Sequence, residues 1–129
     1  MVVVSIIKRD NSEETIECNY TRLKDGFLVM AWTDDTKKLR ERIVSGDSIK
    51  YIVIFSESFS QKEKDDFNSK VIFLNTEGEE EKIECKFAKI KEGFLVIAFE
   101  SAEGNKILST QRIIPSHRIQ NVFITSYRS

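Results

Sequence analysis

The stretches DGFLVMAW, at Asp25–Trp32, and EGFLVIAF, at Glu92–Phe99, are nearly the same eight letters written twice in a chain of 129 residues. The likeness extends towards the N-terminus: when Thr15–Trp32 is aligned with Lys82–Phe99, nine of the 18 positions are identical. Chance alone would give about one identity. It also continues after three extra residues, where the letters RIV from Arg42 meet RII from Arg112. The chain therefore contains two copies of one unit.

Each copy has the pattern of β structure. Residues 15–23 alternate between apolar and polar side chains, which is typical of a strand with one buried face, and Lys24-Asp25-Gly26 predicts a tight turn. The following FLVMAW is apolar on both faces, which predicts a central strand covered on both sides or a strand that bends around a small barrel. With Val2–Lys8, Leu39–Val44 and Ile49–Phe55, each copy has five predicted strands.

Five short strands with a one-turn break between the fourth and the fifth resemble the small barrels of the SH3-like and Sm-like kind. The stretch IVSGDSIKYIVI is similar to the second signature of Sm-like RNA-binding proteins at Gly46, Asp47 and Ile49, whereas Ser45 stands where those proteins carry an RNA-stacking arginine. IIPSHRIQNV, at Ile113–Val122, resembles the ending of a family of small archaeal proteins, some of which are linked to RNA processing. The resemblance implies an SH3-like or Sm-like fold and an RNA ligand.

The predicted fold class is therefore all-β, with two tandem five-stranded small barrels at residues 1–56 and 70–129. A barrel of this size buries little of its surface alone, so we expect the two barrels to pack against each other. Between them lies the linker 57–69, ESFSQKEKDDFNS, in which Ser60 and Glu63 have the spacing of a capping box. The linker is predicted to contain a short helix that docks on a barrel.

Composition narrows the classes of protein that the chain can be. The 20 basic and 21 acidic residues give a net charge of −1, which argues against a strongly basic nucleic-acid binder and against a protein that binds anionic membranes. No apolar run approaches the roughly 18 residues that span a membrane, and the N-terminus is predicted to be a strand rather than a signal peptide. We expect a cytoplasmic protein, and the abundance of Ile, Lys and Glu is typical of a thermophile.

Few residues could carry chemistry. The single histidine, His117, sits in a predicted turn, where a surface imidazole that caps backbone groups is the simple interpretation. Cys18 and Cys85 occupy equivalent inward positions, so we expect both thiols to be reduced and buried. The sequence offers no zinc site, no glycine-rich phosphate loop and no nucleophile–base pair. We therefore expect a protein without catalytic activity, cofactor or metal.

The strongest candidate for a binding site is TKKLRER, at Thr36–Arg42. If Leu39, Glu41 and Ile43 share one strand face, then Lys38, Arg40 and Arg42 share the other, and such a strip could follow phosphates. This predicts a module that binds RNA or single-stranded nucleic acid, with contacts from Lys37, Lys38, Arg40, Arg42, Arg112, His117 and Arg118. The alternative is a charged edge strand that prevents aggregation, in a protein-interaction or structural module. The sequence leaves the partner and the oligomeric state open.

Overall fold

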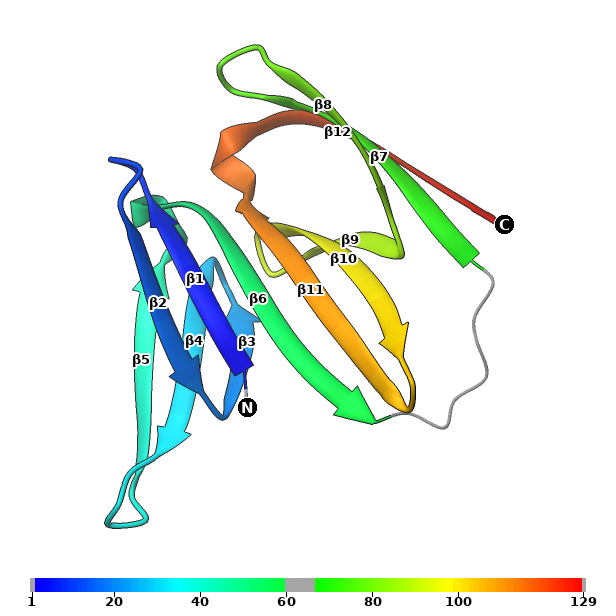
Figure 1. Ribbon diagram of the computed structural model, residues 1–129. Helices are drawn as coiled ribbons and strands as arrows, with labels where there is room; N and C mark the ends of the chain where they lie inside the picture. The colour runs from blue at the N-terminus through cyan, green and yellow to red at the C-terminus, as the bar shows by residue number, and fades with distance from the viewer. Residues whose placement is uncertain (1, 60–66, 129) are drawn as a thin grey trace.

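The described part of the chain consists of β-strands and two single-turn 3-10 helices (Figure 1). The computed structural model describes residues 2–59 and 67–128, which we call the first and the second half. Within these residues no helix is long and apolar enough to cross a membrane. The elements of the first half are β1 (Val2–Lys8), β2 (Glu13–Cys18), β3 (Tyr20–Lys24), β4 (Phe27–Thr33), β5 (Leu39–Ser45), η1 (Gly46–Ser48) and β6 (Ile49–Phe59).

The second half repeats this order. Its elements are β7 (Phe67–Asn75), β8 (Glu80–Cys85), β9 (Phe87–Lys91), β10 (Phe94–Glu103), β11 (Lys106–Pro115), η2 (Ser116–Arg118) and β12 (Ile119–Arg128). The strand registers also repeat: Phe27 lies opposite Ser45, and Phe94 lies opposite Pro115. The all-β prediction is confirmed, and the repeat in the sequence corresponds to a repeat in strand pairing.

Each half contributes two groups of three strands, and one strand pair joins the halves. In the first half the groups are β2-β1-β6 and β3-β4-β5; in the second they are β8-β7-β12 and β9-β10-β11. Strand β6 also pairs with β11, from Ile52 opposite Ile113 to Phe59 opposite Lys106. This junction produces the six-stranded sheet β2-β1-β6-β11-β10-β9 that crosses the molecule in Figure 1.

The predicted strand 15–23 is broken in two, so each half has six strands rather than five. The break lies at Asn19, whose backbone N–H donates to the carbonyl of Ala31 at 2.9 Å and whose Oδ1 accepts from the N–H of Thr33 at 2.9 Å. In the second half the N–H of Lys86 donates to the carbonyl of Ala98 in the same way, at 2.8 Å. The bend lets one continuous segment serve both sheets of its half.

Two other details differ from the sequence-based expectation. The described residues form three antiparallel sheets and no closed barrel, because β5 and β12 each have a strand neighbour on one side only. Strand β6 runs to Phe59 and β7 begins at Phe67, so strands occupy both ends of the predicted linker 57–69. The helix predicted around Ser60–Glu63 lies outside the described residues.

The hydrophobic core is divided between the halves, but the division is unequal. The first core contains first-half residues such as Leu28 and Met30, together with Phe94, Val96 and Ile113 from the second half. The second core takes its buried side chains from the second half alone: Val71, Phe73, Cys85, Leu95, Ile97 and Ile114. Strand β10 is thus covered on both faces, as the apolar pattern predicted, and it contributes alternate side chains to two cores.

Candidate functional site

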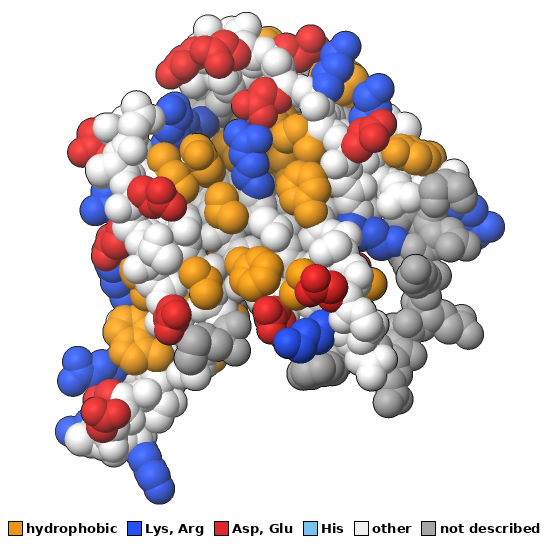
Figure 2. Space-filling model, viewed as in Figure 1, with side chains coloured by type: hydrophobic (Ala, Val, Ile, Leu, Met, Phe, Trp, Pro, Cys, Tyr) orange, Lys and Arg blue, Asp and Glu red, His pale blue; other side chains and the backbone are white. Residues whose placement is uncertain are grey.

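The predicted basic strip lies on β5 and on the loop before it. Arg40 and Arg42 pair with Trp32 and Met30 of β4, so their side chains share the face of the sheet that is turned towards the first core. Lys37 and Lys38 lie in the β4–β5 loop, where both are exposed. Figure 2 shows Lys and Arg side chains gathered at the tip of this protruding hairpin, at the lower left of the view.

Two of the predicted phosphate ligands form the same ion pair in both halves. Arg42 donates to both carboxylate oxygens of Glu14, at 2.6 and 3.0 Å, and Arg112 donates to both oxygens of Glu81, at 2.8 and 3.3 Å. The hydrogen bonds from Arg42 hold the pKa of the Glu14 carboxyl below its usual value. Because Arg42 and Arg112, like Glu14 and Glu81, are equivalent in the repeat, this pair belongs to the shared fold.

Three further candidates also lie next to carboxylates. Arg40 Nε lies 3.0 Å from Asp34 Oδ2, Arg118 Nη2 lies 3.7 Å from Glu77 Oε1, and His117 Nδ1 lies 3.8 Å from Asp47 Oδ1. In the described part of the chain, the ammonium groups of Lys37 and Lys38 have no ion pair. The seven predicted residues do not converge on one surface: Arg112 and Arg118 pair within the second half, whereas the two lysines project from the first.

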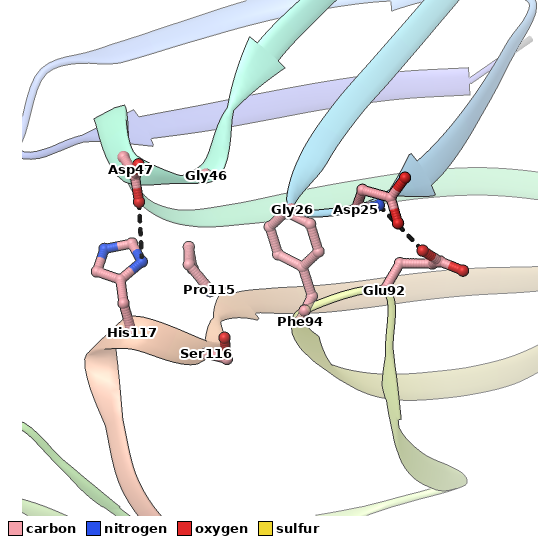
Figure 3. Close-up of a pocket in the computed structure, with 10 residues that line it drawn as sticks. Asp25, Gly26, Gly46, Asp47, Glu92, Phe94, Pro115, Ser116 and His117 are labelled. Carbon is pink, nitrogen blue, oxygen red and sulfur yellow. Dashed lines mark hydrogen bonds and ion pairs between the residues drawn. The ribbon is translucent and has the colours of Figure 1, made fainter.

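A cavity of about 360 Å³ lies where the turns of the two halves meet (Figure 3). The N–H of Gly26 donates to the carbonyl of Glu92 at 2.8 Å, and the N–H of Gly46 donates to the carbonyl of Gly26 at 2.8 Å. The ring of Phe94 points towards these turns, and a Cβ on Gly46 would lie 3.3 Å from that ring and 2.8 Å from Gly26 O. Asp25, Asp47, Glu92 and His117 line the cavity, but the described residues contain no group of three metal-binding side chains.

The cavity is therefore best explained as part of the contact between the halves. Its hydrogen bonds are mostly between backbone groups, which need only the close approach that the glycines permit. Among its acidic side chains, Glu92 accepts a hydrogen bond at Oε2 from the backbone N–H of Asp25, at 3.0 Å, and Asp47 lies 3.8 Å from His117. These contacts hold the two turns together and bury Phe94 beneath them.

An exposed apolar surface covers the β3-β4-β5 sheet on the side away from the first core. Strand pairing places Tyr20, Phe27, Leu39 and Ile43 on this side, and we call these four residues the outer face. All four are exposed; Phe27 keeps 43% and Ile43 keeps 58% of its surface accessible. The outer face adjoins the edge of β5 that has no strand neighbour among the described residues. Such a surface next to an open strand edge is suited to binding a polypeptide.

Strand β12 provides a second open edge. Among the described residues it pairs with β7 on one side only, and Phe123, Ile124 and Tyr127 are exposed along it. The strand has ten residues, and its single charged residue is Arg128. Long apolar edges of this kind are sites where further strands add.

Both of these surfaces escaped the sequence-based argument. Phe27 has the same letter as Phe94 in the repeat, and identity between two copies is expected wherever they share a fold, so nothing distinguishes Phe27 as a surface residue. The signal that could have found the outer face was the apolar pattern of β4 on both of its faces, because a strand of this kind needs two covers. Nothing comparable marks β12, whose alternation is weak.

The two cysteines lie where the sequence placed them. Cys18 and Cys85 are buried at equivalent positions of β2 and β8, and both are free thiols. Burial raises the pKa of each thiol above its usual value, which favours the unreactive protonated form. They are therefore part of the two cores and not of a reactive site.

No protein-family model, no curated protein and no solved structure matches the chain. The functional interpretation consequently depends on the geometry of this molecule. Two features of the described residues remain after the ion pairs are assigned to the fold: the outer face with the free edge of β5, and the free edge of β12.

Proposed function

We propose that this chain is a non-catalytic protein-interaction module that binds a polypeptide on the outer face and along the free edge of β5. The observation that carries the proposal is the pair of exposed side chains Phe27 and Ile43, which lie beside an unpaired strand edge. A partner strand on β5 would satisfy backbone N–H and C=O groups, and its side chains would cover the apolar surface. The near-zero net charge suits a protein partner.

The proposal can be tested with displayed random peptides long enough to form one strand. The chain is immobilised sparsely, so that two molecules cannot meet, and bound peptides are compared on the wild type and on Ile43→Arg. Ile90→Arg is the matched control, because Ile90 has the same exposure of 58% but lies on β9. We expect peptides with alternating apolar residues that bind the wild type and Ile90→Arg and are lost on Ile43→Arg. Absence of enrichment, or equal binding to all three proteins, would contradict the proposal.

We also propose a second candidate function, binding of RNA or single-stranded nucleic acid at the β4–β5 hairpin. It is favoured by the two exposed lysines, Lys37 and Lys38, which lie at the tip of the hairpin and whose ammonium groups form no ion pair with the described residues. The single 3-10 turn between β5 and β6 and the strand order support the proposed likeness to SH3-like and Sm-like folds, from which the RNA hypothesis comes.

This second function makes a different prediction. The double variant Lys37→Glu, Lys38→Glu should weaken binding to labelled oligonucleotides by a similar factor for every sequence, and should flatten the dependence on salt. The double variant Lys89→Glu, Lys91→Glu, which changes the net charge by the same amount on β9, serves as the control. Fluorescence anisotropy at low and physiological ionic strength measures both effects, and an absence of salt-sensitive binding by the wild type would exclude this function.

A further inference from the structure

We infer that the partner of the outer face is a second molecule of the same chain, bound head to tail so that β5 of one chain pairs with β12 of the next. This inference rests on the proposed interaction function and names the partner. The argument starts from the β6–β11 junction, because β5 and β12 are the strands that correspond to β11 and β6 in the other half. Each chain therefore carries one used and one unused version of the same strand pair.

The internal junction shows what such a contact buries. Phe94 and Ile113 of the second half are 0% and 1% exposed, because both are inserted into the first core. Their equivalents in the first half are Phe27 and Ile43, which are 43% and 58% exposed. The same two side chains are thus fully covered where the junction exists and open where it does not.

The receiving side shows the complementary difference. In the first half, Ile54 of β6 is 7% exposed beneath the residues that the second half supplies. Its equivalent in β12, Ile124, is 37% exposed. Ile49 and Ile52 are buried, whereas their equivalents Ile119 and Val122 are only half-buried. The second core therefore lacks a cover on the side that corresponds to the covered side of the first.

The internal junction also specifies a register for the contact between chains. Ile113 lies opposite Ile52, and Ser109 lies opposite Ser56. The equivalent residues are found by subtracting 70 from the numbers in β11 and adding 70 to those in β6. Ile43 then lies opposite Val122 of the next chain, and Leu39 lies opposite its Ser126. In this register the outer face of one chain lies against the open side of the second core of the next.

Two local differences distinguish the new contact from its template. Strand β5 begins at Leu39 and β11 begins at Lys106, so the contact between chains is shorter at that end. Ser116 stands in the receiving turn at the position equivalent to Gly46, where an added Cβ would lie 3.3 Å from the Phe94 ring in the internal junction. Phe27 of an incoming chain therefore sits slightly further from the turn than Phe94 does. Neither difference blocks the backbone pairing.

A head-to-tail contact joins two different surfaces, so it repeats from chain to chain. It generates a closed ring if the rotation at each junction closes, and an open filament if it does not. In both cases the particle mass is a multiple of the chain mass and rises with concentration.

The first test measures particle mass by light scattering over a wide range of concentration. We expect the wild type and Ile90→Arg to assemble, and Ile43→Arg to need a concentration at least about tenfold higher, because the new guanidinium would be buried without a partner. A wild type that stays monomeric overturns the inference, although the peptide experiment above can still support a different protein partner. Assembly that is unchanged in Ile43→Arg also overturns it.

The second test checks the register by disulfide formation between chains. A chain that carries both Leu39→Cys and Ser126→Cys should form disulfides between neighbouring chains on mild oxidation and give covalent multimers. The reason is that these two positions lie directly opposite each other in the expected register. The pair Leu39→Cys and Thr125→Cys, which is shifted by one residue, is the control and should cross-link poorly. Equal cross-linking of the two pairs, or none by either, would show that the chains do not meet in this way.

Discussion

At the scale of single residues, Arg42 was predicted from the sequence to contact phosphate, but in the structure it forms an ion pair with Glu14. Its two hydrogen bonds require the planar guanidinium of arginine, so Arg42→Gln removes both. Because both side chains are partly exposed, we expect a loss of only about 0.5–1 kcal/mol in the free energy of unfolding at neutral pH. Urea denaturation measures the loss, and Arg9→Gln, an exposed position in a turn, is the control.

The same pair predicts a dependence on pH. The pKa of Glu14 is lowered in the folded chain, so the stabilisation is present above the unfolded pKa and is lost as the pH falls through the folded one. The difference in unfolding free energy between the wild type and Arg42→Gln should therefore shrink in acid. A difference that stays constant from neutral to strongly acidic pH would show that the pair contributes through packing and not through charge.

Gly46 and Ser116 offer a comparison between equivalent positions. A Cβ at Gly46 would lie 2.8 Å from the carbonyl oxygen of Gly26, which is backbone and cannot swing away. We expect Gly46→Ala to cost about 1–3 kcal/mol in unfolding free energy, whereas Ser116→Ala, which only removes a hydroxyl, should change little. Thermal denaturation compares the two variants, and similar losses in both would mean that the turns do not approach as closely as described.

At the scale of the strands, the two versions of the edge differ in how their backbone groups are satisfied. Among the described residues, β11 has strand neighbours on both sides and β5 on one side. In the Ile43→Arg variant, kept dilute so that it is monomeric, the amides of β11 should therefore exchange with deuterium more slowly than those of β5. Mass spectrometry of peptic fragments resolves the two strands. Equal protection of β5 and β11 in the monomer would indicate that β5 is covered from within the chain.

Most of the strands could be predicted from the sequence, and the sheets into which they assemble could not. Alternation in 15–23 and the turn at Gly26 depend on neighbouring residues, so local patterns reveal them. The β6–β11 pairing joins residues such as Ile52 and Ile113, which are far apart in the chain and are selected by burial rather than by local preference. The ion pairs escaped for the same reason, since Glu14 and Arg42 lie on strands that only the folded chain brings together.

At the scale of the whole molecule, the shared core makes the halves depend on each other. Phe94→Ala should cost about 3–5 kcal/mol in unfolding free energy, because it leaves a cavity in the first core. In dilute protein, Phe27→Ala at the equivalent, exposed position should cost much less. Fluorescence of Trp32, the single tryptophan, reports on the first half, and circular dichroism reports on both. One common transition is expected, and equal losses in the two variants would contradict the unequal division of the cores.

The junction between β6 and β11 joins the last strand of the first half to the second-to-last strand of the second half. The two halves therefore use different edges for the contact, and the molecule has two different ends. Within one chain the covalent connection holds the two halves at a high effective concentration, so this contact forms whenever the chain folds. The contact between chains has no such tether and responds to the amount of protein present. An assembly built in this way always contains an even number of halves, and it grows or dissolves only at every second contact.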